Sequence, residues 1–196
     1  MGALTKIDSR RVADVIEHTG LESASAKLMR GDLPVEQGIE LLRSAGRIID
    51  AIKLLAHALP KREAVWWACT CARALLGNGI SLDDEQAIAK AEAWVYEPND
   101  ANARAAYGEA EPRGFQTPGG WAAVAAFWSS GSLAPPEHPV VAPADYLTGV
   151  AVAGAITMAA VVEPVLEMDA RYMKFLDYGL DIAAGGTARG PDGHPI

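Results

Sequence analysis

Cysteine is scarce in this sequence, and the two that occur are poorly placed for metal or redox chemistry. The 196 residues include only Cys69 and Cys71, which are separated by a single residue. Successive helical positions are rotated by about 100°, so these two sulfurs point about 200° apart and cannot bind one metal ion together. A disulfide between them is also geometrically unfavourable. The pattern favours two buried free thiols in a reducing compartment.

Long apolar runs are missing as well. The longest, residues 146–162, has 17 residues, and its many alanines and glycines make it only weakly hydrophobic. A membrane-spanning helix needs about 20 predominantly apolar residues, so a buried core helix explains this run better. The charged residues 1–11 are not followed by the apolar segment of a secretory signal. We therefore expect a cytoplasmic protein without a membrane span.

Positive charge is in short supply beyond the N-terminal part of the chain. The formal net charge is −8; residues 1–62 contain ten Lys/Arg and eight Asp/Glu, whereas residues 63–196 contain seven and seventeen. An acidic body without a stripe of Lys/Arg argues against nucleic acid binding, because nucleic acid affinity depends on neutralising phosphates. A partner with a basic or amphipathic surface suits this charge better, and solubility alone explains the charge equally well.

Catalytic motifs are absent too. The sequence has no G-x-S-x-G, no Walker loop and no G-x-G-x-x-G. Its histidines lie far apart without metal-ligand spacing, and they are His18, His57, His138 and His194. A place near a helix C-terminus explains His57 without catalysis, because the helix dipole favours a cation there. We expect no catalytic residue, no bound metal or cofactor, and no enzymatic activity.

The sequence does contain strong helical periodicity. Apolar residues recur every three or four positions, and no alternating run is long enough to predict a strand. The pattern predicts an all-α fold, a compact bundle of about eight helices. Helices are expected at 9–18, 23–29, 32–56 with a kink or break at 44–46, 60–77, 81–96, 99–111, 117–128, 143–162 and 164–184. The last two are either separate or one helix kinked at Pro164.

The length and composition suit one domain. Half of the residues are apolar and 21% are charged, an ordinary globular composition that predicts a single domain at residues 1–186. The tail at 187–196 is expected to be disordered. Four prolines fall between residues 129 and 143, which predicts an extended connecting segment that crosses the surface and can present a binding edge.

The helix at 60–77 carries the most distinctive cluster of side chains. Four of them make a candidate polar or ligand site: Glu63, Trp66, Thr70 and Arg73. A buried guanidinium must be paired, so we expect Arg73 to form an ion pair or to bond to carbonyl groups. The functional alternative is an anion site at Arg73 with help from the amides of residues 119–120. That alternative fails if an internal carboxylate fully pairs Arg73 and no pocket reaches it.

Four segments of the sequence resemble a known bacterial family. They are LPKREAVWWACTCAR (59–73), AEAWVYEPND (91–100), TPGGWAAVAAFWSSGSLAPPEHP (117–139) and FLDYGLDIAAGG (175–186). Together they look like an uncharacterised domain-of-unknown-function family associated with type VI secretion gene clusters, over residues 35–186. The motifs of that family carry no known catalytic roles, so no functional residue is transferred. The resemblance implies a cytoplasmic accessory or adaptor protein, not an enzyme.

These observations favour a non-enzymatic accessory protein that binds another protein. In its most specific form, the hypothesis makes the partner a type VI secretion component or effector. Two other hypotheses stay open. One is a helical domain that binds a small molecule or anion with Arg73 and Trp66. The other is an immunity protein that neutralises a toxin through its acidic surface.

Overall fold

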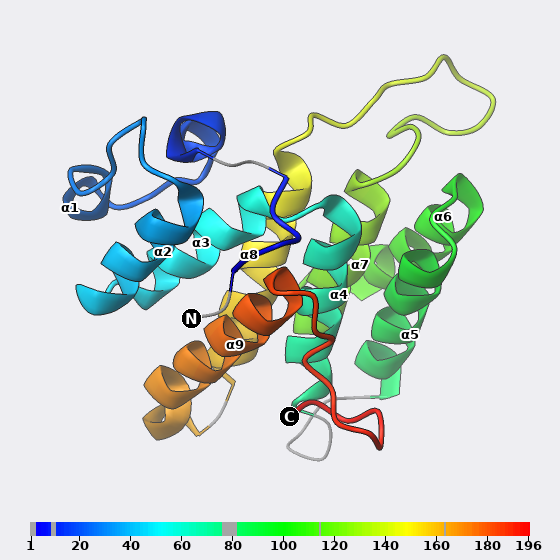
Figure 1. Cartoon of the computed structure of the whole chain (residues 1–196). Coiled ribbons are helices and arrows are strands. Elements are labelled where there is room, and N and C mark those ends of the chain that lie inside the picture. Colours follow the sequence, from blue (N-terminus) through cyan, green and yellow to red (C-terminus); the bar gives the residue numbers. More distant parts are fainter. Residues whose placement is uncertain (1–2, 9–10, 76–81, 114, 163) are drawn as a thin grey trace.

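The computed structural model describes residues 3–8, 11–75, 82–113, 115–162 and 164–196. These residues form nine α-helices and no β-strand (Figure 1), which confirms the predicted all-α bundle. The α-helices are α1 (Ser23–Ala26), α2 (Val35–Ser44), α3 (Ile48–Ala58), α4 (Lys61–Arg73), α5 (Leu82–Tyr96), α6 (Asp100–Ala110), α7 (Pro118–Trp128), α8 (Leu147–Ala160) and α9 (Met168–Ala183). Short 3-10 helices are η1 (Val12–Asp14), η2 (Ile16–His18), η3 (Glu111–Arg113) and η4 (Val165–Glu167).

Helix α8 lies at the centre of the bundle. It packs against α3, α4, α7 and α9, while α5 and α6 pack on α7 and on each other. Most side chains of α8 are small, and Ala151, Ala155 and Ala159 are buried. Small side chains allow neighbouring helices to approach closely, because the distance between helix axes depends on the side chains at the contact. The sequence predicted this role from the apolar residues on nearly every side of the helix.

Trp67 joins α4 to α9 in the core. Its ring is fully buried, and a Cβ on Gly179 of α9 would lie 2.5 Å from that ring. The indole Nε1 donates a hydrogen bond to the carbonyl oxygen of Phe175 at 2.7 Å, so its polar group is satisfied although it is buried. The absence of a side chain at position 179 is therefore what lets these two helices touch.

Local sequence signals place several helix ends correctly. The predicted break at residues 44–46 is present, since α2 ends at Ser44 and Gly46 adopts a φ of +71° that favours glycine. At the start of α7, the Thr117 side chain accepts a hydrogen bond from the amide of Gly120 at 3.1 Å. Asn99 caps α6 in the same way. These helix ends are therefore marked in the sequence by their capping residues or by a glycine.

Other boundaries differ from the prediction. The expected helix at 9–18 is instead the pair of short 3-10 helices η1 and η2. The helix expected from residue 143 begins only at Leu147, and Asp145, just before it, forms an ion pair with Lys61. The stop predicted at residues 77–79 and the cap predicted at Ser81 lie outside the described residues.

Helices α8 and α9 are separate, which answers the question that Pro164 left open. Arg171 of α9 joins them, since its guanidinium donates hydrogen bonds to the carbonyl oxygens of Ala160, Val162 and Pro164. Among the helices in the described ranges, none combines the length and apolar character needed to cross a membrane.

Candidate functional site

Arg73 is paired with a carboxylate inside the protein, as the sequence analysis expected. Its Nε and Nη2 donate to the two carboxylate oxygens of Glu92 on α5, each at 2.6 Å. Arg189 donates to one of the same oxygens at 2.5 Å. Glu92 is only 8% exposed. Burial by itself raises the pKa of Glu92, but the two guanidinium groups outweigh it and hold that pKa below its usual value.

The same network attaches the C-terminal segment to the bundle. The Arg189 guanidinium lies over the Trp66 ring, 3.9 Å from the ring centre, in a cation–π contact. Trp66 Nε1 donates to the carbonyl oxygen of Thr187 at 3.0 Å, and Ala188 is 1% exposed. The Ala188 amide donates to Asp181 on α9 at 2.8 Å. The sequence analysis expected disorder from residue 187 onward, whereas these contacts place the beginning of the tail against α4, α5 and α9.

The other predicted site residues also have partners within the protein. Thr70 is buried, and its hydroxyl donates to the carbonyl oxygen of Trp66 at 3.0 Å. Glu63 lies 3.7 Å from the Lys6 ammonium. Glu63 and Trp66 line a surface pocket of about 360 Å³, but Arg73 does not line it. Arg73 is therefore a weaker candidate for an anion site, because it already pairs with Glu92 and does not line this pocket.

Contacts within the fold also surround residues 119–120. Gly120 donates its N–H to the Thr117 hydroxyl, as described above. A Cβ on Gly119 would lie 2.4 Å from the Asp84 carboxylate of α5, so this end of α7 is packed tightly against its neighbour. Close packing explains these two glycines, and there is no space for an anion beside Gly119.

The cysteines offer no reactive thiol. Cys69 and Cys71 are both free and fully buried. Burial raises the pKa of each thiol well above its usual value, so the nucleophilic thiolate form is disfavoured. Within the described part of the chain, no group of three or more His, Cys, Asp and Glu side chains is arranged to hold a metal ion.

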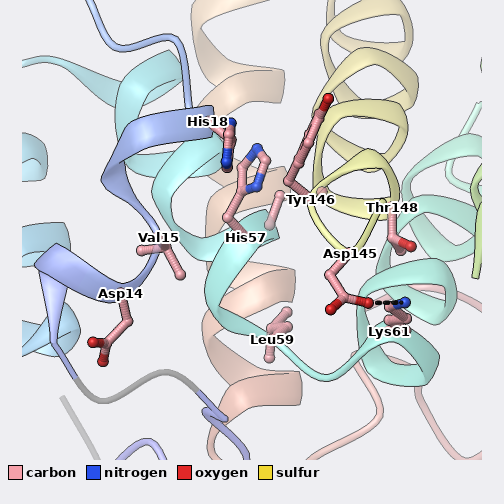
Figure 2. Close-up of a pocket in the computed structure, with 11 residues that line it drawn as sticks. Asp14, Val15, His18, His57, Leu59, Lys61, Asp145, Tyr146 and Thr148 are labelled. Atoms are coloured by element: carbon pink, nitrogen blue, oxygen red, sulfur yellow. Dashed lines mark hydrogen bonds and ion pairs between the residues drawn. The ribbon is translucent and has the colours of Figure 1, made fainter. Parts of the chain in front are cut away.

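A second pocket brings together residues that are far apart in the sequence. It has a volume of about 260 Å³ and lies among η1, η2, the end of α3, the start of α4 and the start of α8 (Figure 2). The side chains that give it its chemistry are Asp14, His18, His57, Lys61, Asp145 and Tyr146. We call it the histidine pocket.

His57 is a half-buried polar residue of the histidine pocket. Its ring packs directly on α8, where a Cβ on Gly149 would lie 2.6 Å from the imidazole Nδ1. Burial, and secondarily the nearby His18, lower the pKa of His57 from 6.5 to about 4. Neither ring nitrogen has a hydrogen-bond partner among the residues that the structure describes. At neutral pH His57 is therefore an uncharged imidazole with one nitrogen free to accept a hydrogen bond.

The mouth of the histidine pocket combines stacked rings with charged groups. The rings of His18 and Tyr146 stack with their centres 4.0 Å apart. Asp145 is 98% exposed and accepts a hydrogen bond from Lys61 at 2.9 Å, which lowers the pKa of its carboxyl group. Asp14 accepts a hydrogen bond from the amide of Arg11. The sequence analysis treated His18 and His57 separately, because only the packing of η2 on α3 and α8 brings them together.

The predicted proline-rich connection is an exposed loop that continues to the edge of the histidine pocket. Figure 1 shows it extending away from the helices between α7 and α8. At its base, the hydroxyl groups of Ser129 and Thr148 are 3.0 Å apart and hydrogen bonded. Further out, Leu133 donates its N–H to the Val141 carbonyl oxygen at 2.8 Å. We call residues 129–146 the clasped loop.

Two side chains close the neck of the clasped loop. The buried Ser132 hydroxyl accepts hydrogen bonds from the amides of Ala134 at 3.1 Å and Val141 at 3.0 Å. Arg104 of α6 donates to the carbonyl oxygens of Ser132 and Ala134. Beyond this neck, residues 135–142 are all exposed. The exposed large apolar side chains on or beside the loop are Leu133, Val140, Val141, Tyr146 and Val150.

A family model described as a family of unknown function, DUF6931, matches residues 38–183. The chain belongs to this family. The match agrees with the resemblance to an uncharacterised family seen in the sequence. It includes the clasped loop and most of the histidine pocket, whereas Asp14, His18 and Arg189 lie outside it. Searches of curated proteins and of solved structures found no match.

Proposed function

We propose that this protein is a non-enzymatic accessory protein that binds another protein through the clasped loop. The proposal rests on Val140, which is 77% exposed beyond a neck that hydrogen bonds close. Single exposed valines are common on protein surfaces. Here Val141 and Leu133 are exposed on the same loop, which gives a partner several apolar side chains to cover.

The closed neck favours binding because it limits the conformations that the free loop can adopt. Arg104 donates a hydrogen bond to the Ser132 carbonyl oxygen, and the Val141 amide donates one to the Ser132 hydroxyl. These bonds hold the two sides of the neck together in the absence of a partner. Proline rings restrict the backbone further at residues 135, 136 and 139. A loop that is already ordered loses less conformational entropy on binding, so more of the contact energy appears as affinity.

Charge indicates the chemistry of the partner. Glu137 and Asp145 are exposed on the clasped loop, and the chain as a whole carries a formal charge of −8. Complementary charge increases association rates and discriminates between partners. The partner that fits is a protein with an apolar patch surrounded by basic residues.

In its more specific form, the proposal makes the partner a cytoplasmic component or effector of a type VI secretion system. The four segments that resemble a secretion-associated family support this form. The acidic surface is also compatible with an immunity protein, and the identity of the captured partner distinguishes the two roles.

Site-specific photo-crosslinking tests the proposal. A photoreactive amino acid is placed at Val140 in the full chain in its native host, and crosslinked proteins are identified by mass spectrometry. The matched control position is Leu166 in η4, an equally accessible apolar residue that is 99% exposed and lies beyond the other end of α8. We expect one protein to be captured repeatedly at 140 and not at 166. Identical capture at both positions, or no capture at 140, would contradict the proposal.

Substitution then measures how much the loop contributes. Val140→Asp is expected to weaken binding of the captured, purified partner at least tenfold in calorimetry, because it places a charge in the apolar contact. Leu166→Asp introduces the same charge elsewhere and should leave the affinity unchanged. Both variants should keep the parent thermal unfolding midpoint, since both side chains are solvent exposed. Equal affinities for Val140→Asp and the parent would contradict the proposal.

A further inference from the structure

The volume of the histidine pocket suits a single amino-acid side chain better than a metabolite. Pockets for small metabolites and cofactors are usually about 300–1,000 Å³, whereas this one is about 260 Å³. Part of its wall is apolar and comes from Val15, Ala56 and Leu59. These apolar groups can contact the aliphatic part of a long side chain. The polar end of that side chain would then lie near the imidazoles.

The polar groups of the histidine pocket mostly accept hydrogen bonds. Uncharged His57 offers an unpartnered ring nitrogen, and the carboxylates of Asp14 and Asp145 line the same pocket and lie below the imidazole in Figure 2. Lys61, the cation that lines the pocket, is already paired with Asp145. An anionic ligand would face the Asp14 carboxylate, the Lys61–Asp145 ion pair, which has no net charge, and an uncharged imidazole. A cation that only donates hydrogen bonds fits much better.

The aromatic pair favours a flat cation. Tyr146 and His18 stack on each other at the mouth, where Figure 2 shows them beside His57. A guanidinium is planar, stacks on aromatic rings and can donate to several acceptors at once, whereas an ammonium is a compact point charge. An arginine side chain combines this planar guanidinium with methylene groups that can pack against the apolar wall.

The position of the pocket connects it to the clasped loop. Asp145 and Tyr146 end the loop and also line the pocket, and Thr148 joins both to the loop base through Ser129. A protein bound across the exposed apolar residues of the loop therefore has neighbouring residues above the pocket mouth.

We propose that the histidine pocket receives an arginine side chain of the partner, between Asp14 and Asp145 and against His57 and Tyr146. This inference rests on the proposed function for the source of the arginine. It deepens that function by naming the chemistry that the partner presents next to its apolar patch.

The pocket can be tested without the partner by titrating the whole protein with N-acetyl-arginine amide. Histidine ring signals are followed by NMR in protein carrying labelled histidine. We expect saturable shifts for His18 and His57 and none for His138 and His194, which serve as internal controls outside the pocket. N-acetyl-citrulline amide has nearly the same shape without the charge, and it should cause no saturable shift. Equal shifts with citrulline, saturable shifts with acetate or phosphate, or no shift with the arginine probe would overturn the inference.

Substitutions locate the contacts. His57→Phe keeps an aromatic ring but removes the acceptor nitrogen, so it should abolish the saturable shift of His18. Asp14→Asn should weaken binding of the probe about two- to fivefold, the range expected for an exposed ion pair. Glu137→Gln, which removes an exposed carboxylate outside the pocket, should leave it unchanged. An equal loss in Asp14→Asn and Glu137→Gln would mean general charge attraction and would overturn the inference.

The two proposals fail separately. If crosslinks at Val140 identify a partner but the arginine probe does not bind, only the arginine assignment is overturned. If the probe binds the pocket but Val140 contacts no partner, the proposed function fails and the pocket remains an arginine site.

Discussion

At the scale of single residues, charge pairing inside the bundle decides which side chains matter most. Glu92 is buried and accepts hydrogen bonds from both Arg73 and Arg189, so a single carboxylate pairs with two cations. A buried ion pair contributes little when compared with an apolar replacement, but removal of one partner leaves an uncompensated charge. The carboxylate of Glu92 is therefore more sensitive to substitution than either arginine alone.

Glu92→Gln should lower the free energy of unfolding by about 2 to 4 kcal/mol, because it leaves two partly buried guanidinium groups without a charged partner. Chemical denaturation measured by circular dichroism checks this value. Glu97→Gln removes an exposed carboxylate just beyond the same helix and should change stability by less than about 0.5 kcal/mol. Equal effects of the two substitutions would mean that the network does not stabilise the fold.

His57 makes stability depend on pH in a defined window. Its pKa is about 4 in the folded protein and 6.5 as the ordinary value, so the unfolded chain binds the proton more readily. The stabilisation is thus complete above about pH 6.5 and is lost as the pH falls toward 4, by about 2 kcal/mol at most for a half-buried ring. The charged or titratable groups that line the same pocket are His18, Lys61, Asp14, Asp145 and Tyr146, of which His18 acts on the pKa of His57.

The variant His57→Gln isolates this contribution. Denaturation at several pH values should show a smaller loss of stability between pH 6.5 and 4 in His57→Gln than in the parent. His138→Gln, on the exposed loop, should follow the parent. If His57→Gln and the parent lose stability in parallel over this window, His57 is not the titrating group.

Residue-scale inference from the sequence was partial. The need of Arg73 for a partner followed from the cost of burying a guanidinium, and the structure confirms an ion pair. Its partners could not be named, since nothing in the spacing of Glu92 or Arg189 indicates that α5 and the tail meet α4. His18 and His57 were missed for the same reason, because tertiary packing alone brings them together.

At the scale of helices, the glycines are of two kinds. Some allow two helices to pack closely, whereas others have open space beside them. Gly179 of α9 lies against the Trp67 ring, whereas a Cβ on Gly108 of α6 would meet no atom within 4 Å. Both lie within helices, where glycine is less favourable than alanine by about 1 kcal/mol. The same substitution at the two positions should therefore have opposite effects.

Gly179→Ala should destabilise the protein by about 1 to 3 kcal/mol, since the new methyl group overlaps the buried indole. Gly108→Ala should stabilise it by about 0.5 to 1 kcal/mol, because alanine loses less backbone entropy. Thermal and urea denaturation of both variants measure the difference. Stabilisation by Gly179→Ala would show that α4 and α9 are not in close contact at Trp67.

Helix ends were predicted best where a side chain or a glycine caps them. Gly46 and Thr117 define their boundaries through local geometry that a sequence displays directly. The start of α8 was misplaced because Pro143 resembles a first helical residue, while Asp145 pairs with Lys61 on another helix.

At the scale of the whole molecule, the C-terminal segment is part of the bundle. Removal of residues 187–196 should lower stability by about 2 kcal/mol, because Glu92 loses Arg189 and Trp66 loses its cation–π contact. Acrylamide quenching of tryptophan fluorescence should increase as Trp66 becomes more accessible. Removal of residues 190–196 alone keeps both contacts and should change neither quantity much. Equal effects of the two truncations would contradict this role of residues 187–189.

The exposed residues of the clasped loop are separate from the residues that pack in the helical core. Ser132 and Val141 are hydrogen bonded at the neck, so the exposed part of the loop begins and ends at nearly the same place. The residues between them contribute almost nothing to the packed core, because nearly all of them are exposed. Sequence changes within this stretch should therefore leave the stability of the helical core nearly unchanged, so the stretch can vary independently of the bundle.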